Sequence, residues 1–230
     1  MAATDDLDVI RRSFDRAWVP TAALPADAAS VLAPVVDAPG GPYVLLERRP
    51  TGPSVFAGQL GFPGGRIEPG DRDPLAAALR EAEEEVGFHP ADVEVVGHLT
   101  EMDNHLGRRV LAYVGIVPLA AIPSAPASPA EVAELLLVPL SGLRTPGPAP
   151  ATAPFMAPLG IYHPESYESR VLQGRDRPLH YWHLAEAGGA RNAVLWGLTG
   201  ELVARMLSRL WGWTPPSAPR AIDGWEGLRP

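Results

Sequence analysis

The chain has 230 residues, which is enough for one sizeable domain with its own core and short for two. Its 19 Lys and Arg against 27 Asp and Glu give a formal net charge of −8, which argues against binding to nucleic acid or to an anionic membrane. The sequence has no cysteine, so disulfides, thiolate nucleophiles and cysteine-based zinc sites are excluded.

The amino-terminal segment carries acids where a signal peptide needs basic residues, and no stretch reaches the ~20 apolar residues of a membrane span. We therefore expect a soluble, cytoplasmic protein. Within residues 5–18, apolar side chains recur at spacings of three and four, which predicts an amphipathic helix packed on the main body. These side chains are Leu7, Ile10, Phe14 and Trp18.

A predicted hairpin and a predicted helix follow. Residues 31–37 and 43–48 are typical of strands, and the Pro-Gly-Gly-Pro sequence at 39–42 is a strong turn signal between them. Asp73 followed by Pro74 predicts the start of a helix, with Asp73 as its cap, and Gly87 predicts its end.

The second half of the chain mixes strands with long loops. We expect strands over residues 93–99, 109–117 and 132–140, and a last strand over 181–184. The Pro/Ala-rich stretches 118–130 and 144–158 are expected to be loops, and the apolar periodicity of 192–211 predicts a long closing helix. Because strands and helices do not alternate regularly and there is no Gly-rich phosphate loop, a doubly wound nucleotide-binding fold is not favoured.

Three glutamates share one face of the helix predicted from Asp73 to Gly87. At about 100° per residue, Glu81, Glu84 and Glu85 fall within roughly 100° of arc, whereas Glu83 points away and is expected to be exposed. Carboxylates at this spacing repel one another, and the C-terminal half of a helix also disfavours negative charge. Converging oxygen ligands of this kind are those that Mg²⁺ or Mn²⁺ prefers.

The alternative interpretation of three such glutamates is a solvated acidic face, which is what charge runs usually form. Their surroundings favour a cation site instead. A Pro-Gly-Gly turn at 63–65 precedes the helix, and its glycines let the backbone come close to a ligand or metal. Asp71 and Arg80 stand beside the acidic face in the sequence.

This stretch resembles the Nudix box, written G-x5-E-x7-R-E-U-x-E-E-x-G-U. The corresponding residues are Gly65-x5-Asp71-x8-Arg80-Glu81-Ala82-x-Glu84-Glu85-x-Gly87-Phe88. Asp replaces the first Glu, and the gap before Arg80 is one residue longer than usual. Both departures resemble the coenzyme A diphosphatase (CoA pyrophosphatase) branch of the family, which carries this longer, Asp-containing box.

That branch also has an upstream motif, L-L-T-x-R-S/A-x3-R-x3-G-x3-F-P-G-G, whose spacing is reproduced here. The corresponding residues are Leu45-Leu46-Glu47-Arg48-Arg49-Pro50, Ser54, Gly58 and Phe62-Pro63-Gly64-Gly65. Glu47 stands where Thr is usual, Pro50 replaces Ser or Ala, and Ser54 replaces an Arg that helps to read substrate phosphates. The segments 131–140 and 196–199 also resemble this branch.

The resemblance implies an α+β fold, the α/β/α Nudix sandwich. Its mixed β-sheet is flanked by helices, with a strand-loop-helix that carries the site and a long C-terminal helix. For the division of the chain we expect an N-terminal helix and lead-in over residues 1–30, a Nudix hydrolase domain over 31–212 and a C-terminal tail over 213–230.

The resemblance assigns roles only to matching positions. Glu81 and Glu85 resemble the principal metal ligands, Glu84 a further ligand or a catalytic carboxylate, and Gly64 or Gly65 a source of a backbone carbonyl ligand. Arg80 is expected to orient the acids by charge-assisted hydrogen bonds, with Asp71 as its partner. The cofactor would be Mg²⁺ or Mn²⁺.

The identity of the general base stays open at this point, because in this family it sits on the helix or on a later loop. The candidates are Glu84, Glu131 and Glu134. Substrate binding is expected from Arg49 or Arg48, and since neighbouring strand residues face opposite ways, only one of the two should meet the diphosphate. The motif register favours Arg49, with further contacts from Gly58, Phe62 and Gly64.

The implied activity is metal-dependent hydrolysis of a diphosphate linkage in a small nucleotide. Coenzyme A or a derivative would give adenosine 3',5'-bisphosphate and 4'-phosphopantetheine. Because Ser54 lacks the expected cation, other Nudix substrates such as ADP-ribose, dinucleotide polyphosphates or nucleoside triphosphates are a second hypothesis, and a catalytically silent nucleotide-binding module is a third. The sequence is compatible with a homodimer. The histidines and the C-terminal tryptophans are expected to be surface or packing residues.

Overall fold

The computed structural model describes residues 3–53, 56–147, 159–175, 177–187 and 191–224. Helices and strands succeed one another irregularly along this part of the chain. The helices are α1 (Ala3–Arg12), α2 (Pro74–Glu85), α3 (Leu140–Arg144) and α4 (Gly197–Trp211), with short 3-10 turns η1 (Pro90–Asp92) and η2 (Leu119–Ala121). The strands are β1 (Ala29–Ala38), β2 (Gly41–Arg48), β3 (Leu60–Gly61), β4 (Gly64–Arg66), β5 (Glu94–Asp103), β6 (Arg109–Pro118), β7 (Glu134–Pro139), β8 (Gly160–Leu172), β9 (Leu179–Glu186), β10 (Asn192–Leu195) and β11 (Arg220–Ile222).

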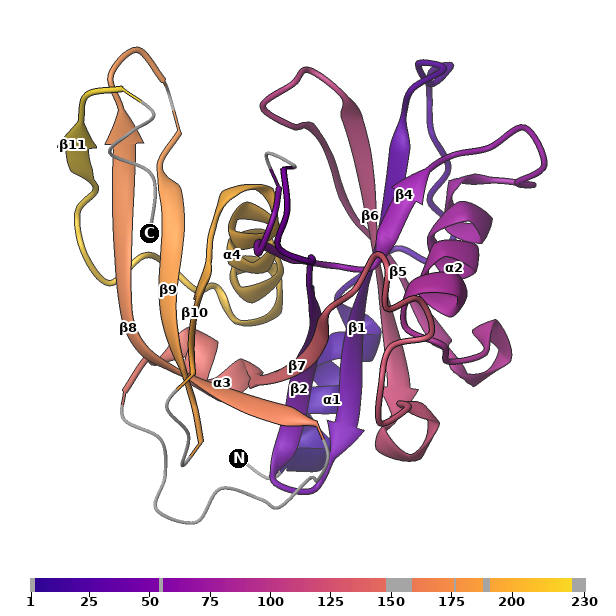
Figure 1. Ribbon diagram of the computed structural model, residues 1–230, viewed down its shortest axis with the longest axis horizontal. Helices are drawn as coiled ribbons and strands as arrows, with labels where there is room; N and C mark the ends of the chain where they lie inside the picture. The colour runs from indigo at the N-terminus through magenta and orange to yellow at the C-terminus, as the bar shows by residue number, and fades with distance from the viewer. Residues whose placement is uncertain (1–2, 54–55, 148–158, 176, 188–190, 225–230) are drawn as a thin grey trace.

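One mixed sheet runs through the molecule, in the order β10-β9-β8-β7-β2-β1-β6-β5 (Figure 1). β1 is parallel to β6, and β7 is parallel to β8, whereas the remaining neighbours in this order are antiparallel. Helices cover both faces, so the expected α+β sandwich is confirmed. The predicted hairpin is also confirmed, because β1 and β2 pair around their tight turn.

Alternation along β1 divides the core between the two faces of the sheet. Leu32 and Val36 point to the face that α2 covers, whereas Ala33 and Val35 point to the face covered by α1 and α4. On the α2 face, the helix contributes small side chains such as Ala78 and Ala82. These small residues let the helix approach the sheet closely.

The helix that carries the acidic face begins where the sequence predicts. The Asp73 side chain accepts a hydrogen bond of 2.8 Å from the backbone N–H of Ala76, and Pro74 occupies the first turn. The helix ends at Glu85, and Gly87 follows in the left-handed region with φ +103°. This start holds α2 in register against β4 and β1.

The prediction of one helix over residues 5–18 is wrong at its C-terminal end, because α1 stops at Arg12. The chain then turns so that Asp15 forms an isolated bridge with His98 on β5. Gly97 permits this contact, since a Cβ there would lie 2.6 Å from backbone atoms of Asp15. Trp18 stacks on the His98 ring at 3.4 Å, so the side chain is used for packing outside the helix.

The prediction of a single closing helix over residues 192–211 is also wrong at its start. Residues 192–195 form β10, which pairs with β9, and α4 begins only at Gly197. The strand over 181–184 lies within β9 but is not the last strand, because β10 and β11 follow it. The polar strand β8 was not predicted.

Of the two Pro/Ala-rich stretches, 118–130 contains only the short turn η2, and most of 144–158 lies outside the described residues. Over the described ranges, no helix combines the length and apolar character that crossing a bilayer requires.

Replacing Asp73 by Ala is expected to lower the free energy of unfolding by about 1 kcal/mol, because the first turn of α2 loses its cap. Glu83→Ala on the exposed side of the same helix serves as the control and should change it by less than about 0.5 kcal/mol. Urea denaturation of both variants measures the difference. Equal effects of the two substitutions would contradict the role of the cap.

Candidate active site

Two glycines of β4 permit close approaches, Gly64 to β1 and Gly65 to the Glu81 side chain of α2. At Gly64 the backbone has φ +153°, and an added Cβ would lie 2.4 Å from the carbonyl oxygen of Ser30. At Gly65 an added Cβ would lie 2.4 to 2.7 Å from the carboxyl group of Glu81, which would have to move aside. The Gly-Gly turn therefore leaves room for the neighbouring strand and for this position of the Glu81 carboxyl group.

Glu85 is held by this strand. Its carboxylate accepts a hydrogen bond of 2.8 Å from the backbone N–H of Gly64, in a buried position. Burial nevertheless raises the pKa of Glu85 above the ordinary 4.5, to about 7, although the Gly64 hydrogen bond acts in the opposite direction. Burial likewise raises the pKa of Glu81.

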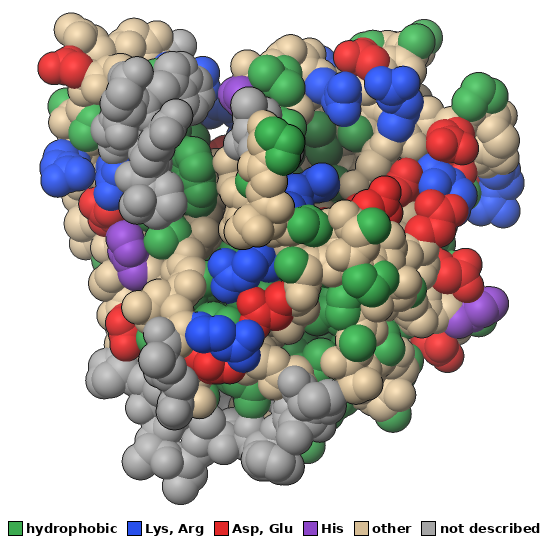
Figure 2. Space-filling model, in the orientation of Figure 1, with side chains coloured by type: hydrophobic (Ala, Val, Ile, Leu, Met, Phe, Trp, Pro, Cys, Tyr) green, Lys and Arg blue, Asp and Glu red, His purple; other side chains and the backbone are tan. Residues whose placement is uncertain are grey.

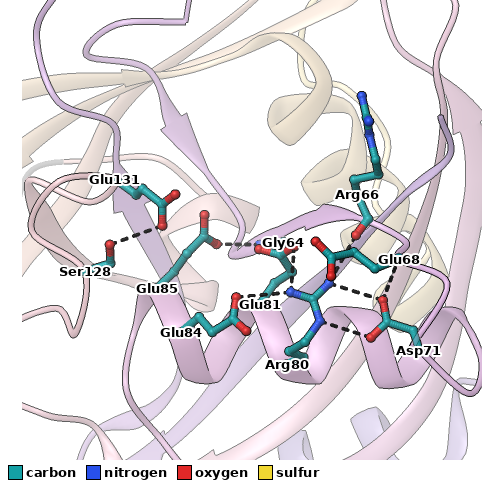
Figure 3. A network of polar contacts seen from close by, with 10 residues as sticks. All are labelled: Gly64, Arg66, Glu68, Asp71, Arg80, Glu81, Glu84, Glu85, Ser128 and Glu131. Atoms are coloured by element: carbon teal, nitrogen blue, oxygen red, sulfur yellow. Dashed lines mark hydrogen bonds and ion pairs between the residues drawn. The ribbon is translucent and has the colours of Figure 1, made fainter.

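Arg80 lies between the acids, and its predicted pairing with Asp71 is present (Figure 3). Nε and Nη2 donate to the two oxygens of Asp71 at 3.0 and 3.2 Å, and this fork holds the pKa of Asp71 below its usual value. Nη1 lies 3.1 Å from an oxygen of Glu81 and 3.1 Å from one of Glu84. Arg80 therefore fixes both glutamates from one side.

The helix presents more negative charge than these contacts offset. Figure 2 shows acidic and arginine side chains interleaved over α2. Within the residues that the structure describes, no three acidic or histidine side chains are gathered as a ready cation site. Arg80 holds Glu81 and Glu84, and Glu85 turns to Gly64. The raised pKa values of Glu81 and Glu85 and the oxygen donors of the three glutamates fit a hard divalent cation, which would lower the cost of keeping these carboxylates ionised.

A fourth carboxyl group belongs to the cluster and was not predicted as a site residue. Glu47 on β2 is fully buried, and burial together with the neighbouring carboxylate of Glu85 raises its pKa to about 8. In the sequence, Glu47 is noted only because it stands where the upstream motif has Thr. The signal that could have found it is an acid in the middle of an otherwise apolar strand.

A pocket of about 340 Å³ opens beside these carboxylates. Arg49, Glu85 and Glu131 line it, together with Phe56 and the segment that follows Arg49. The structure therefore brings residues of the upstream motif, the helix and a later loop to one cavity.

The neighbouring arginine faces the other way. Arg48 pairs with Glu134 at 2.9 Å instead of lining this pocket, whereas Arg49 lines it, so that Arg49 stays the predicted partner of the diphosphate. Phe62 is placed in the core on the face of α4, and Gly58 shapes the loop after Arg49 with φ +70°.

The two later acids also differ in their surroundings. Glu134 accepts hydrogen bonds from Arg48, from the Tyr162 hydroxyl at 2.8 Å and from Arg191 at 2.8 Å. Glu131 is exposed, lines the pocket and accepts one hydrogen bond, from the Ser128 hydroxyl at 3.1 Å.

The metal-free protein is expected to lose stability as the pH rises from about 6.5 to about 8. In the folded state Glu47 and Glu85 stay protonated at pH values where the unfolded chain has already lost these protons. Because the folded state then binds more protons, the free energy of unfolding falls as the pH rises toward their raised pKa values. Above the ordinary histidine pKa of 6.5, the buried histidines with lowered pKa values no longer oppose this trend. Thermal denaturation with a chelator should register a loss of about 1 kcal/mol or more. The Glu85→Gln variant should lose less, and a rise in stability over this range would contradict the expectation.

Comparison with known proteins adds an independent observation. The family model described as NUDIX domain matches residues 26–159. A Cronobacter sakazakii protein named uncharacterized Nudix hydrolase NudL is 34% identical over 181 residues, covering 77% of this chain and 80% of that protein. A protein of the same name from Escherichia fergusonii is 44% identical, covering 77% of this chain and 80% of that protein. The solved structure of a C. elegans Ap4A hydrolase binary complex is 19% identical, with a TM-score of 0.41, and covers 49% of this chain and 80% of that chain.

The family match spans more than half of the chain, and it includes both the upstream motif and the acidic helix. The chain therefore belongs to the Nudix family and is a Nudix pyrophosphohydrolase of nucleoside diphosphate derivatives.

Proposed function

We propose that the enzyme hydrolyses the diphosphate linkage of coenzyme A or its derivatives, using Mg²⁺ or Mn²⁺. The observation that carries this proposal is the shared pocket, which Arg49 of the upstream motif and Glu85 of the helix both line. The Arg49 guanidinium on one side and a cation held by carboxylates on the other would suit a diphosphate, because the negative oxygens of the diphosphate are attracted to both positive groups. The volume of about 340 Å³ is in the range of small-molecule sites.

Nudix hydrolases generally use divalent metal ions. Glu81, Glu84 and Glu85 would hold the cation here, with the Gly65 carbonyl as a further oxygen ligand. When bound, the cation would offset phosphate charge and acidify the attacking water. Arg80, which is itself fixed by Asp71, positions Glu81 and Glu84 for this task.

Among the candidate bases, the contacts favour Glu131. Glu134 already receives hydrogen bonds from two arginines and a tyrosine, and it pairs with Arg48, which points away from the pocket. Glu84 is engaged by Arg80. Glu131 faces the cavity and keeps acceptor capacity for a water, so we assign proton removal from the nucleophile to its carboxylate.

The first experiment is product analysis by mass spectrometry after incubation with coenzyme A and Mg²⁺ or Mn²⁺. We expect adenosine 3',5'-bisphosphate and 4'-phosphopantetheine. Glu85→Gln should reduce the rate by roughly 100-fold or more, because even outer-shell partners of a metal contribute about 10- to 100-fold. If folded enzyme supplied with metal releases neither of these products, coenzyme A is not the substrate.

The same assay tests the other nucleotides. ADP-ribose, a dinucleotide polyphosphate and a nucleoside triphosphate form the panel, motivated by Ser54 in place of the Arg that the motif carries. Ser54 lies outside the described residues. If the enzyme cleaves one of these compounds in preference to coenzyme A, that compound replaces coenzyme A as the assigned substrate. A folded enzyme that binds nucleotides without turning any over would favour a binding module.

Glu131→Gln is expected to lower kcat by about 10²- to 10⁴-fold, because the proton acceptor is lost. Its affinity for Mn²⁺ should stay close to that of the parent. Glu134→Gln is the matched comparison and should reduce thermal stability through its lost ion pairs while leaving kcat within about threefold. The reverse pattern would transfer the role of base to Glu134.

A further inference from the structure

Glu47 lies on the α2 face of the sheet. Along β2, Tyr43 and Leu45 point toward α2, whereas Val44 and Leu46 point to the opposite face, so the alternation carries Glu47 to the side of the acidic helix. Its backbone is paired on both sides, with Leu135 of β7 and Gly61 of β3. The position is therefore rigid, and the side chain cannot swing out to solvent by a local movement of the chain.

The Glu47 carboxyl group is buried, and no N–H or hydroxyl donor among the described residues reaches it. Its side chain is 1% exposed, and its one hydrogen-bonding neighbour is the carboxyl group of Glu85, which can share a hydrogen bond with it only while one of the two is protonated. Arg49 Nη2 lies 4.0 Å from Oε1, beyond hydrogen-bond reach, and the Arg49 side chain is 42% exposed. A buried carboxylate in such surroundings is strongly unfavourable unless a positive group completes them.

The surroundings of Glu47 are acidic. Its carboxyl group lies beside that of Glu85 and in the field of Glu131, so residues from β2, α2 and the later loop converge there. Gly61 lies beside it, since a Cβ added there would be in van der Waals contact with Oε1 at 3.6 Å. Glu85 and Glu131 line the pocket proposed for the substrate diphosphate. Arg49, at 4.0 Å, offsets the charge of Glu47 only in part, so a further positive group would fit at the junction of Glu47 and Glu85.

We propose that Glu47 is an additional ligand of the divalent cation, contributed by the central sheet. This rests on the proposed function, in that the cation is the one held by the helix glutamates. A carboxylate fixed in β2 adds a fourth acidic side chain to a set otherwise drawn from α2, and hard oxygen ligands of this kind suit Mg²⁺ or Mn²⁺. The motif that the chain resembles has Thr at this position, so the extra charge is a feature of this chain.

The competing account is that Glu47 is a neutral acid that shares a proton with Glu85 and has no part in holding the cation. The two accounts differ in cation binding itself, which can be measured without turnover. In the first account, removing the charge weakens binding of Mn²⁺. In the second, it leaves the binding of Mn²⁺ unchanged.

The experiment titrates the full-length protein with Mn²⁺ in the absence of nucleotide and follows the free ion by electron paramagnetic resonance. We compare the parent with Glu47→Gln, which keeps the shape and removes the charge, and with Glu47→Thr. Glu201→Gln is the control, because Glu201 is a partly buried acid on α4, on the opposite face of the sheet. We expect both Glu47 variants to bind Mn²⁺ at least about 10-fold more weakly and the control to match the parent.

Thermal denaturation gives a second readout. In EDTA, Glu47→Gln is expected to melt at or above the temperature of the parent, because the amide cannot ionise and so avoids the cost of placing a charge at this buried position. With saturating Mn²⁺ the parent should gain more stability than the variant, since a ligand that binds only the folded state stabilises it in proportion to its affinity. Equal gains in the two proteins would overturn the proposal.

The possible failures are separable. If the parent and all variants bind no Mn²⁺, the proposed metal-dependent function fails together with the inference. If Glu85→Gln loses Mn²⁺ while Glu47→Gln and Glu47→Thr bind it as the parent does, the function stands and the role of Glu47 is refuted. Should Glu47→Gln fail to fold, Glu47→Thr alone decides between the two outcomes.

Discussion

The arrangement of this site depends on how closely α2 approaches β4. Gly65 supplies this closeness, because an added Cβ would displace the carboxyl group of Glu81, and Gly64 lets β4 lie against the backbone of β1. The same approach aims the Gly64 N–H at Glu85 and buries that carboxylate. The carboxyl group of Glu85 is thereby held in a region of low polarity, where its ionisation is costly.

The pleat of β2 and of Arg49, which follows it, directs neighbouring side chains either to ion pairs away from the pocket or toward the pocket and the acidic helix. Arg48 and Glu134 form a closed set of ion pairs and hydrogen bonds, which stabilises the structure away from the pocket. Arg49 lines the pocket, and Glu47 faces the acidic helix. Residues adjacent in the sequence therefore serve stability and chemistry in turn, because successive side chains of a strand point in opposite directions.

Local signals allowed the central part of the fold to be predicted. Asp73 and Pro74 define the helix start by hydrogen bonding and by a fixed φ, and helical periodicity alone groups Glu81, Glu84 and Glu85. The apolar run at residues 192–195 predicts a helix, because so short a run fits the period of a helix as well as that of a strand. Only the pairing with β9 shows that these residues form a strand. The sequence does not place Glu47 in the site, because its acidic neighbours Glu85 and Glu131 come from α2 and a distant loop.

The join between β7 and β8 is only two residue pairs long, Leu136 with Gly160 and Leu137 with Ile161, and beyond it β8 turns to pair with β9. The family match ends at residue 159, close to this join, yet the hydrophobic core does not end there. Leu202 and Met206 of α4 pack in the same cluster as Val35 and Val44 of the matched region. A fragment cut at the boundary of the family match would uncover a broad apolar sheet surface, so the region that the family model matches is smaller than the unit of folding.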